Sequence, residues 1–122
     1  YGTVNGFRAS VASPFYWYDL EQESSTALQL FPFCYMDANS FFEQKQSPAE
    51  AYRELMEYYQ SVKKVKGLFI TVWHNSVLGT SAPFSDWRNL FEVFMKEVVY
   101  WGQWSVCIKE TRYRKKACIM RL

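Results

Sequence analysis

The stretch GLFITVWHN, residues 67–75, decides the fold. Its central run, LFITVW, is apolar on both alternating faces and rich in β-branched and aromatic residues, which predicts a strand covered on both sides, as in a parallel sheet. The run ends at His74, the only histidine in the chain. The sequence therefore carries its single imidazole to the end of a buried strand.

A helix with clear start and stop signals precedes this strand, over about residues 48–65. Ser47 can cap the first turn, Pro48 suits the first helical position, and Glu50 completes a capping box. Apolar residues recur at helical spacing, and lysines lie near the negative end of the helix dipole. Gly67 then ends the helix, so we expect a helix that leads directly into the strand.

Three further segments complete the expected order of elements. SDWRNLFEVFMKEVVYWG predicts a second helix over about residues 85–100, with Ser85 as its cap. TALQLFPFCYM, residues 26–36, predicts a second strand with Pro32 at an edge or bulge, and TVNGFRA, residues 3–9, predicts a weaker third strand. The alternation of strands and helices predicts an α/β fold with an open, mostly parallel sheet and flanking helices. The inward residues of the second helix are expected to be Trp87, Leu90, Phe91, Phe94, Met95 and Val98.

Composition narrows the class of protein. A net charge of +2, with 21% charged residues, creates no global field that would recruit nucleic acid or a membrane surface. No apolar run reaches the roughly 20 residues that a membrane-spanning helix needs. Cys34, Cys107 and Cys118 lack the paired short spacings of a zinc site, so we interpret them as free thiols in a reducing, cytoplasmic compartment.

The end of the chain differs in character from the rest. WSVCIKE could form a strand, whereas RYRKK, residues 112–116, is a dense basic cluster. Such a cluster can bind phosphate-rich partners, but on a nearly neutral chain it is more often a solvated surface. We therefore divide the chain into a main domain, residues 1–102, and a basic tail, residues 103–122.

Three charged or titratable residues follow the predicted strands. His74 ends the buried strand, Asp37 ends the strand over residues 26–36, and Arg8 lies near the end of residues 3–9. Because the carboxyl ends of parallel strands meet at one edge of a sheet, these side chains are expected to converge there. Each residue also has an ordinary structural alternative: His74 could make a structural hydrogen bond, Asp37 could cap a turn, and Arg8 could form an ion pair. A catalytic edge is the hypothesis that unites them.

Aromatic residues are abundant at 20% of the chain, and four of them are consecutive in SPFYWYDLE, residues 13–21. Phe15, Tyr16, Trp17 and Tyr18 cannot all point inward from one strand, so some must line a surface or pocket. Aromatic faces stack on sugar rings, which makes the first three candidate substrate-binding residues. Packing of a loop is the alternative, and core filling is the main use of the aromatic residues elsewhere.

In this order, GFRASVASPFYWYDLE, FPFCYMDAN and GLFITVWHN resemble the C-terminal half of the polysaccharide deacetylase (NodB-homology) family, in the branch found in Bacteroides-like bacteria. The resemblance covers about residues 5–100. It implies a partial (β/α) barrel and removal of acetyl groups from carbohydrate, with a divalent metal such as zinc held by one Asp and two His. Arg8 would orient a catalytic carboxylate, Asp37 would match an acidic motif position, and His74 would be the late general acid.

The chain departs from the family at the metal site. An early pair of aspartates and two histidines separated by three residues are both absent, and Asn75 stands where many members carry Asp. The chain by itself therefore has no metal cofactor, and we expect an inactive part of a carbohydrate deacetylase-like hydrolase. Its opening without Met also suggests a fragment.

Two alternatives are open: a stand-alone half-domain without catalysis, and a non-catalytic carbohydrate- or protein-binding α/β module. The expected partners are acetylated carbohydrate and further copies of the chain, which would self-associate through an exposed sheet edge. Nucleic acid and membrane are not expected partners.

Overall fold

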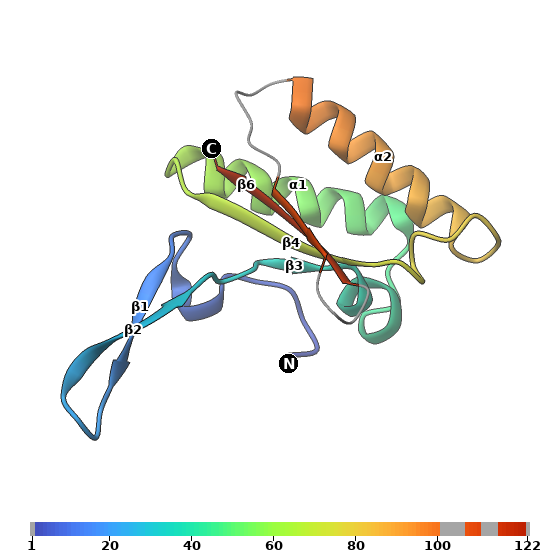
Figure 1. Ribbon diagram of the computed structural model, residues 1–122. Coiled ribbons are helices and arrows are strands. Elements are labelled where there is room, and N and C mark those ends of the chain that lie inside the picture. Colours follow the sequence, from blue (N-terminus) through green and yellow to red (C-terminus); the bar gives the residue numbers. More distant parts are fainter. Residues whose placement is uncertain (1, 101–106, 111–114, 122) are drawn as a thin grey trace.

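The structure is a computed structural model, and it describes residues 2–100, 107–110 and 115–121 (Figure 1). Helices and strands are mixed, so the chain has a small α/β fold, as expected. The elements, in order, are η1 (Arg8–Ser10), β1 (Phe15–Asp19), β2 (Ser24–Leu30), β3 (Tyr35–Met36), η2 (Asn39–Glu43), α1 (Pro48–Lys64), β4 (Leu68–His74), α2 (Ser85–Tyr100), β5 (Cys107–Glu110) and β6 (Lys115–Arg121).

The larger sheet has the strand order β3-β4-β6-β5. Strands β3 and β4 run parallel, with Tyr35 opposite Thr71, whereas β6 is antiparallel to both β4 and β5. The expectation of a mostly parallel sheet is therefore wrong for the described strands. The connection between β5 and β6 is too short for a parallel crossover, which needs a dozen or more residues. The described strands form an open sheet and close no barrel.

Both helices pack on the side of the sheet to which β4 turns Phe69 and Trp73. The Phe69 ring lies 5.8 Å from Tyr59 of α1 and 6.1 Å from Phe94 of α2, measured between ring centroids. Burial of these large rings gives the core most of its apolar contact. The other buried members of the core are Cys34, Tyr35, Ala51, Leu55, Val62, Val77, Trp87, Leu90 and Val98.

The helix ends follow the sequence signals with one exception. Helix α1 has the full capping box: Ser47 Oγ accepts from the Glu50 N–H, and the Glu50 carboxylate accepts from the Ser47 N–H. Helix α2 begins at Ser85 itself. The Phe84 carbonyl accepts the hydrogen bond from Arg88 N–H, 3.0 Å, so Phe84 rather than Ser85 occupies the capping position.

The capping box gives a stability prediction. Ser47→Ala should lower the free energy of unfolding by about 1 kcal/mol, because an N–H at the start of α1 loses its acceptor. The pKa of the Glu50 carboxyl is lowered, chiefly by the hydrogen bond from the Ser47 side chain. The hydrogen bond from the Ser47 hydroxyl to the ionised Glu50 carboxylate is therefore present at neutral pH and weakens as the pH falls through the lowered pKa of Glu50. Urea unfolding of the wild-type and Ser47→Ala chains should show a smaller difference in the free energy of unfolding in acid than at neutral pH. A difference that does not change with pH would contradict the capping box.

The predicted strand over residues 26–36 is divided in two. Strand β2 pairs antiparallel with β1 in a hairpin, and β3 joins the larger sheet. Pro32 lies in the break between them, consistent with its missing N–H. The chain stays beside β4 nevertheless, because Cys34 N–H donates to the Ile70 carbonyl at 3.0 Å.

The weaker strand predicted over residues 3–9 is absent, which corrects that expectation. The segment does lie along β3: Gly6 N–H donates to the Cys34 carbonyl at 2.8 Å, and Asn5 Oδ1 accepts from Met36 N–H at 2.8 Å. The Asn5 side chain thus takes the place of a backbone carbonyl as the hydrogen-bond acceptor for Met36. Positive φ values of 54° at Ala9 and 55° at Ser10 then turn the chain away from extended structure.

The expected basic tail falls partly outside the described residues, which exclude Arg112, Tyr113 and Arg114. Lys115 and Lys116 begin β6, whose backbone pairs with β4 from Leu68 to His74. No helix among the described residues is both long and apolar enough to cross a membrane.

Candidate functional site

Asp37 and His74 meet at one edge of the sheet, as their positions after parallel strands predict. Asp37 follows β3 and His74 ends β4. His74 Nδ1 lies 2.6 Å from Asp37 Oδ1, and the His74 backbone N–H donates to Asp37 Oδ2 at 2.7 Å. The Ala38 N–H donates to Oδ1, also at 2.7 Å. One carboxylate therefore fixes both the backbone and the ring of the histidine.

The two side chains differ in exposure. Asp37 is fully buried, at 0%, whereas the His74 side chain is 21% exposed. A buried carboxylate needs such donors to offset its lost hydration. Because an ionised carboxylate only accepts hydrogen bonds, Nδ1 carries the proton that it donates to Asp37. This leaves Nε2 as the ring nitrogen for proton exchange, and within the described residues it has no hydrogen-bond partner.

An open cavity of about 400 Å³ lies beside the histidine. Phe42 is 54% exposed and offers an aromatic surface on its wall. The cavity is large enough for a small polar ligand, and His74 lines it together with the polar residues Thr3, Asn39 and Glu43. The residues that line it are Gly2, Thr3, Met36, Ala38, Asn39, Phe42, Glu43 and His74.

A buried polar network behind the cavity holds its walls together. Asn5 Nδ2 donates to Ser40 Oγ at 2.9 Å and to Glu54 Oε2 at 3.2 Å, which ties the segment beside β3 to α1. Asn39 Nδ2 donates to the Val4 carbonyl at 3.2 Å. The sequence predictions missed Asn5, Asn39 and Phe42. The only signal in the sequence was that Asn5 and Asn39 are polar residues next to apolar segments. This pattern does not show which part of the chain their side chains contact.

The structure does not bring Arg8 to Asp37. The Arg8 guanidinium donates to the Val4 carbonyl at 3.1 Å and lies over the Phe33 ring, 5.3 Å from its centroid. Arg8 does not line the cavity, although a Cβ added to the lining residue Gly2 would lie 3.1 Å from Arg8 Nη1. Of the three side chains that were expected to converge, only those of Asp37 and His74 meet. The segment that carries Arg8 is a turn and not a strand.

The aromatic candidates lie on the β1–β2 hairpin, which Figure 1 shows extending away from the sheet. Tyr16 is 59% exposed and Trp17 is 51% exposed, while Phe15 is partly buried. None of the three lines the cavity beside His74. Their contact with sugar stays a prediction, and Phe42 is the aromatic residue that the structure places at this cavity.

The described residues do not bring together the one Asp and two His that the family resemblance implies for its metal. The chain has a single histidine, so one copy cannot supply a site with two histidines, and both Asp37 oxygens already accept hydrogen bonds. Among the described residues, no three His, Cys, Asp or Glu side chains come together. Cys34 is a buried free thiol, as expected, and burial raises its pKa to about 12, so it stays protonated.

No family model matches this chain, and no curated protein or solved structure matches it either.

Proposed function

We propose that this chain forms one edge of the site of a carbohydrate deacetylase-like hydrolase and binds acetylated carbohydrate there. The observation that supports the proposal is the hydrogen bond between Asp37 and His74, at 2.6 Å, beside an open cavity of about 400 Å³. A carboxylate that fixes an imidazole can hold the ring in the orientation that a general acid uses. The family resemblance assigns Asp37 to an acidic motif position and His74 to the late general acid.

Each residue has a defined role in this proposal. Asp37 holds the Nδ1–H side of the ring, so that Nε2 of His74, after it takes up a proton to form the imidazolium, gives that proton to the leaving sugar atom and returns to the neutral ring. Phe42 stacks on one face of the sugar ring, and Asn39 and Glu43 supply polar groups for its hydroxyls. The proposal also includes a cytoplasmic location and a partial (β/α) barrel. The metal ligands of that barrel come from outside these 122 residues.

The chain has one histidine, so its imidazole gives a single, unambiguous set of NMR signals. Titration with an N-acetylated chito-oligosaccharide should shift these signals without releasing acetate. Phe42→Ala should weaken the binding by about tenfold. Phe31→Ala is the matched control, because Phe31 is similarly exposed, at 51%, but does not line the cavity.

The possible results separate the candidate functions. Release of acetate by the chain, abolished in His74→Ala, would show that the chain is catalytic on its own. Binding that leaves the His74 signals unchanged and is lost in Trp17→Ala would favour the second candidate, a non-catalytic carbohydrate-binding module. The exposed Tyr16, Trp17 and Tyr18 are the observation behind that alternative.

A further inference from the structure

The β1–β2 hairpin, residues 15–30, is an arm that lacks a covering layer within the described residues. It contributes no residue to the buried core, and Figure 1 shows it extending away from the sheet. Trp17 is 51% exposed and Leu28 is 58% exposed. An isolated two-stranded hairpin is marginally stable in water, and both of its edges can pair with another strand. The arm therefore has the character of an interaction surface.

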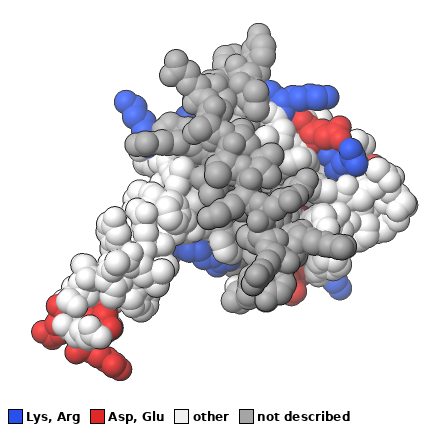
Figure 2. Space-filling model, viewed as in Figure 1, with Lys and Arg blue, Asp and Glu red and all other residues white. Residues whose placement is uncertain are grey.

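The tip of the arm joins one apolar side chain to several acidic ones. Asp19 Oδ1 fixes the turn by accepting from the N–H groups of Glu21, at 2.8 Å, and Gln22, at 3.2 Å. Leu20 is 82% exposed, the highest value among the large apolar residues described. Glu21 and Glu23 are exposed beside it, and Figure 2 shows red acidic atoms gathered at the end of a mostly uncharged arm. The tip thus presents a leucine surrounded by negative charge.

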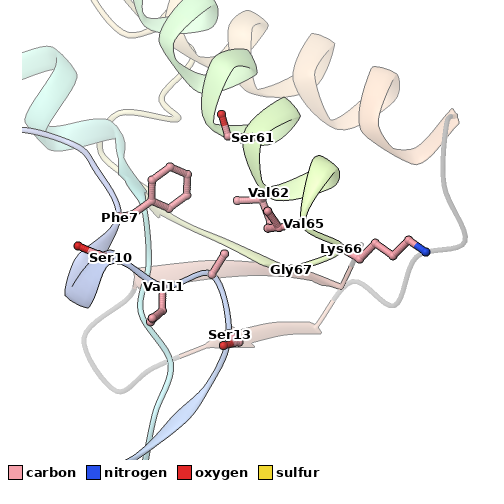
Figure 3. Close-up of a pocket in the computed structure, with 10 residues that line it drawn as sticks. Phe7, Ser10, Val11, Ser13, Ser61, Val62, Val65, Lys66 and Gly67 are labelled. Atoms are coloured by element: carbon pink, nitrogen blue, oxygen red, sulfur yellow. The ribbon is translucent and has the colours of Figure 1, made fainter.

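A cavity of about 500 Å³ lies at the base of the arm (Figure 3). It forms where the chain before β1 meets the end of α1 and the start of β4. Leu68 N–H donates to the Ala12 carbonyl at 2.7 Å, and a Cβ on Gly67 would lie 2.7 Å from that same oxygen, so glycine permits the close approach. The apolar residues that line this cavity are Phe7, Val11, Ala12, Val62 and Val65.

The rim of this cavity is basic. Lys66 lines it, and Lys63 and Lys64 occupy the last turn of α1 next to it. All three residues are exposed. An apolar cavity with a basic rim is complementary to an exposed leucine with acidic neighbours, both in hydrophobic character and in charge.

The two complementary surfaces lie at opposite ends of the arm. Residues 11–13 line the cavity and immediately precede β1, whereas Leu20 follows the far end of β1. A five-residue strand spans about 17 Å. The tip of an extended arm therefore does not reach the cavity of its own chain. When two arms lie antiparallel around a two-fold axis, each tip meets the base of the other arm, and two identical contacts form together.

We propose that the chain forms a symmetric dimer through exchange of these arms. Leu20 of one copy fills the cavity at the base of the other arm, and Glu21 and Glu23 face Lys63 and Lys66 of the second copy. Pairing of the arms also covers the exposed aromatic side chains of β1. Self-association thus has a specific surface, which is separate from the cavity beside His74.

Sedimentation of the full 122-residue chain tests the apolar contact. The wild-type chain should dimerise, and Leu20→Asp should raise the dissociation constant by at least about tenfold, because a charge replaces the buried leucine. Val93→Asp is the matched control, since Val93 is an exposed apolar residue of α2, at 52%, far from the arm in sequence and should leave the dimer unchanged. A wild-type chain that stays monomeric, or a dimer that is indifferent to Leu20→Asp, would overturn the proposal.

Charge reversal tests the pairing itself. A chain with Glu21→Lys and Glu23→Lys should lose self-association, and so should a chain with Lys63→Glu and Lys66→Glu. Mixing the two variants should restore a dimer, because each tip then meets a base of opposite charge. Failure of the mixture to associate would overturn the assigned contact. Monomeric chains that bind chito-oligosaccharide only when Trp17 is intact would instead assign the arm to carbohydrate.

Discussion

Asp37→Ala should lower the free energy of unfolding by about 3–5 kcal/mol. The Asp37 side chain is fully buried and accepts hydrogen bonds from His74 N–H, Ala38 N–H and the His74 ring. Removing the carboxylate leaves these donors without an acceptor in a place that water reaches poorly. An unsatisfied buried donor costs about 1–3 kcal/mol, and the loss of several donors' partners accounts for the range.

Chemical denaturation followed by circular dichroism measures this loss, and an exposed ion pair supplies the control. Glu92 Oε1 lies 2.9 Å from Arg88 Nε on the surface of α2, and both side chains are about half exposed. Glu92→Ala should cost at most about 1 kcal/mol, because water replaces the lost partner. Equal losses in the two variants would show that burial of Asp37 contributes nothing to the strength of its interactions.

Phe94→Ala should lower the free energy of unfolding by a similar amount, about 3–5 kcal/mol. Phe94 is 0% exposed, and its ring centroid lies 6.3 Å from Tyr59 of α1 and 6.1 Å from Phe69 of β4. The side chain therefore joins both helices to the sheet. Its removal opens a cavity in the core, and rigid neighbours on α1 and β4 can only partly close it.

The preceding residue offers a matched control for this prediction. Val93 is on the same helix and is 52% exposed. Val93→Ala should change the free energy of unfolding by no more than about 0.5 kcal/mol, since it removes little buried surface and alanine favours a helix. Thermal or urea unfolding of both variants checks the pair. A Phe94→Ala chain as stable as Val93→Ala would contradict the packing of α2 against the sheet.

The sequence predicted α1 and β4 well because their signals are local. The capping box at Ser47 and the lysines at the end of α1 mark a helix within a single segment, and α1 spans Pro48–Lys64. The unbroken apolar run after Gly67 predicted β4, which spans Leu68–His74. These signals work because a cap and helical spacing involve residues close together in the chain, and an unbroken apolar run is itself a local pattern.

The candidate site was predictable only in part. Asp37 and His74 end adjacent parallel strands, and this one topological fact places them within hydrogen-bonding distance. Arg8 was expected beside them on the assumption of a third strand. Asn5 instead uses its side chain to bind the backbone of Met36, and two positive φ values follow at Ala9 and Ser10, so Arg8 faces elsewhere.

Two larger features depended on tertiary structure alone. The run over residues 26–36 looked like one strand, but the sequence could not show that β2 pairs with β1 in a projecting arm while β3 joins β4. Nor could it show that β6 pairs antiparallel with β4.

The sequence by itself determined where α1, β4 and α2 form and which residues of α2 face the core. Only the tertiary structure decided the direction of the strands, the arm and the residues around His74. The physical reason is that a helix satisfies its backbone hydrogen bonds within its own segment, whereas a strand takes its partners from distant parts of the chain.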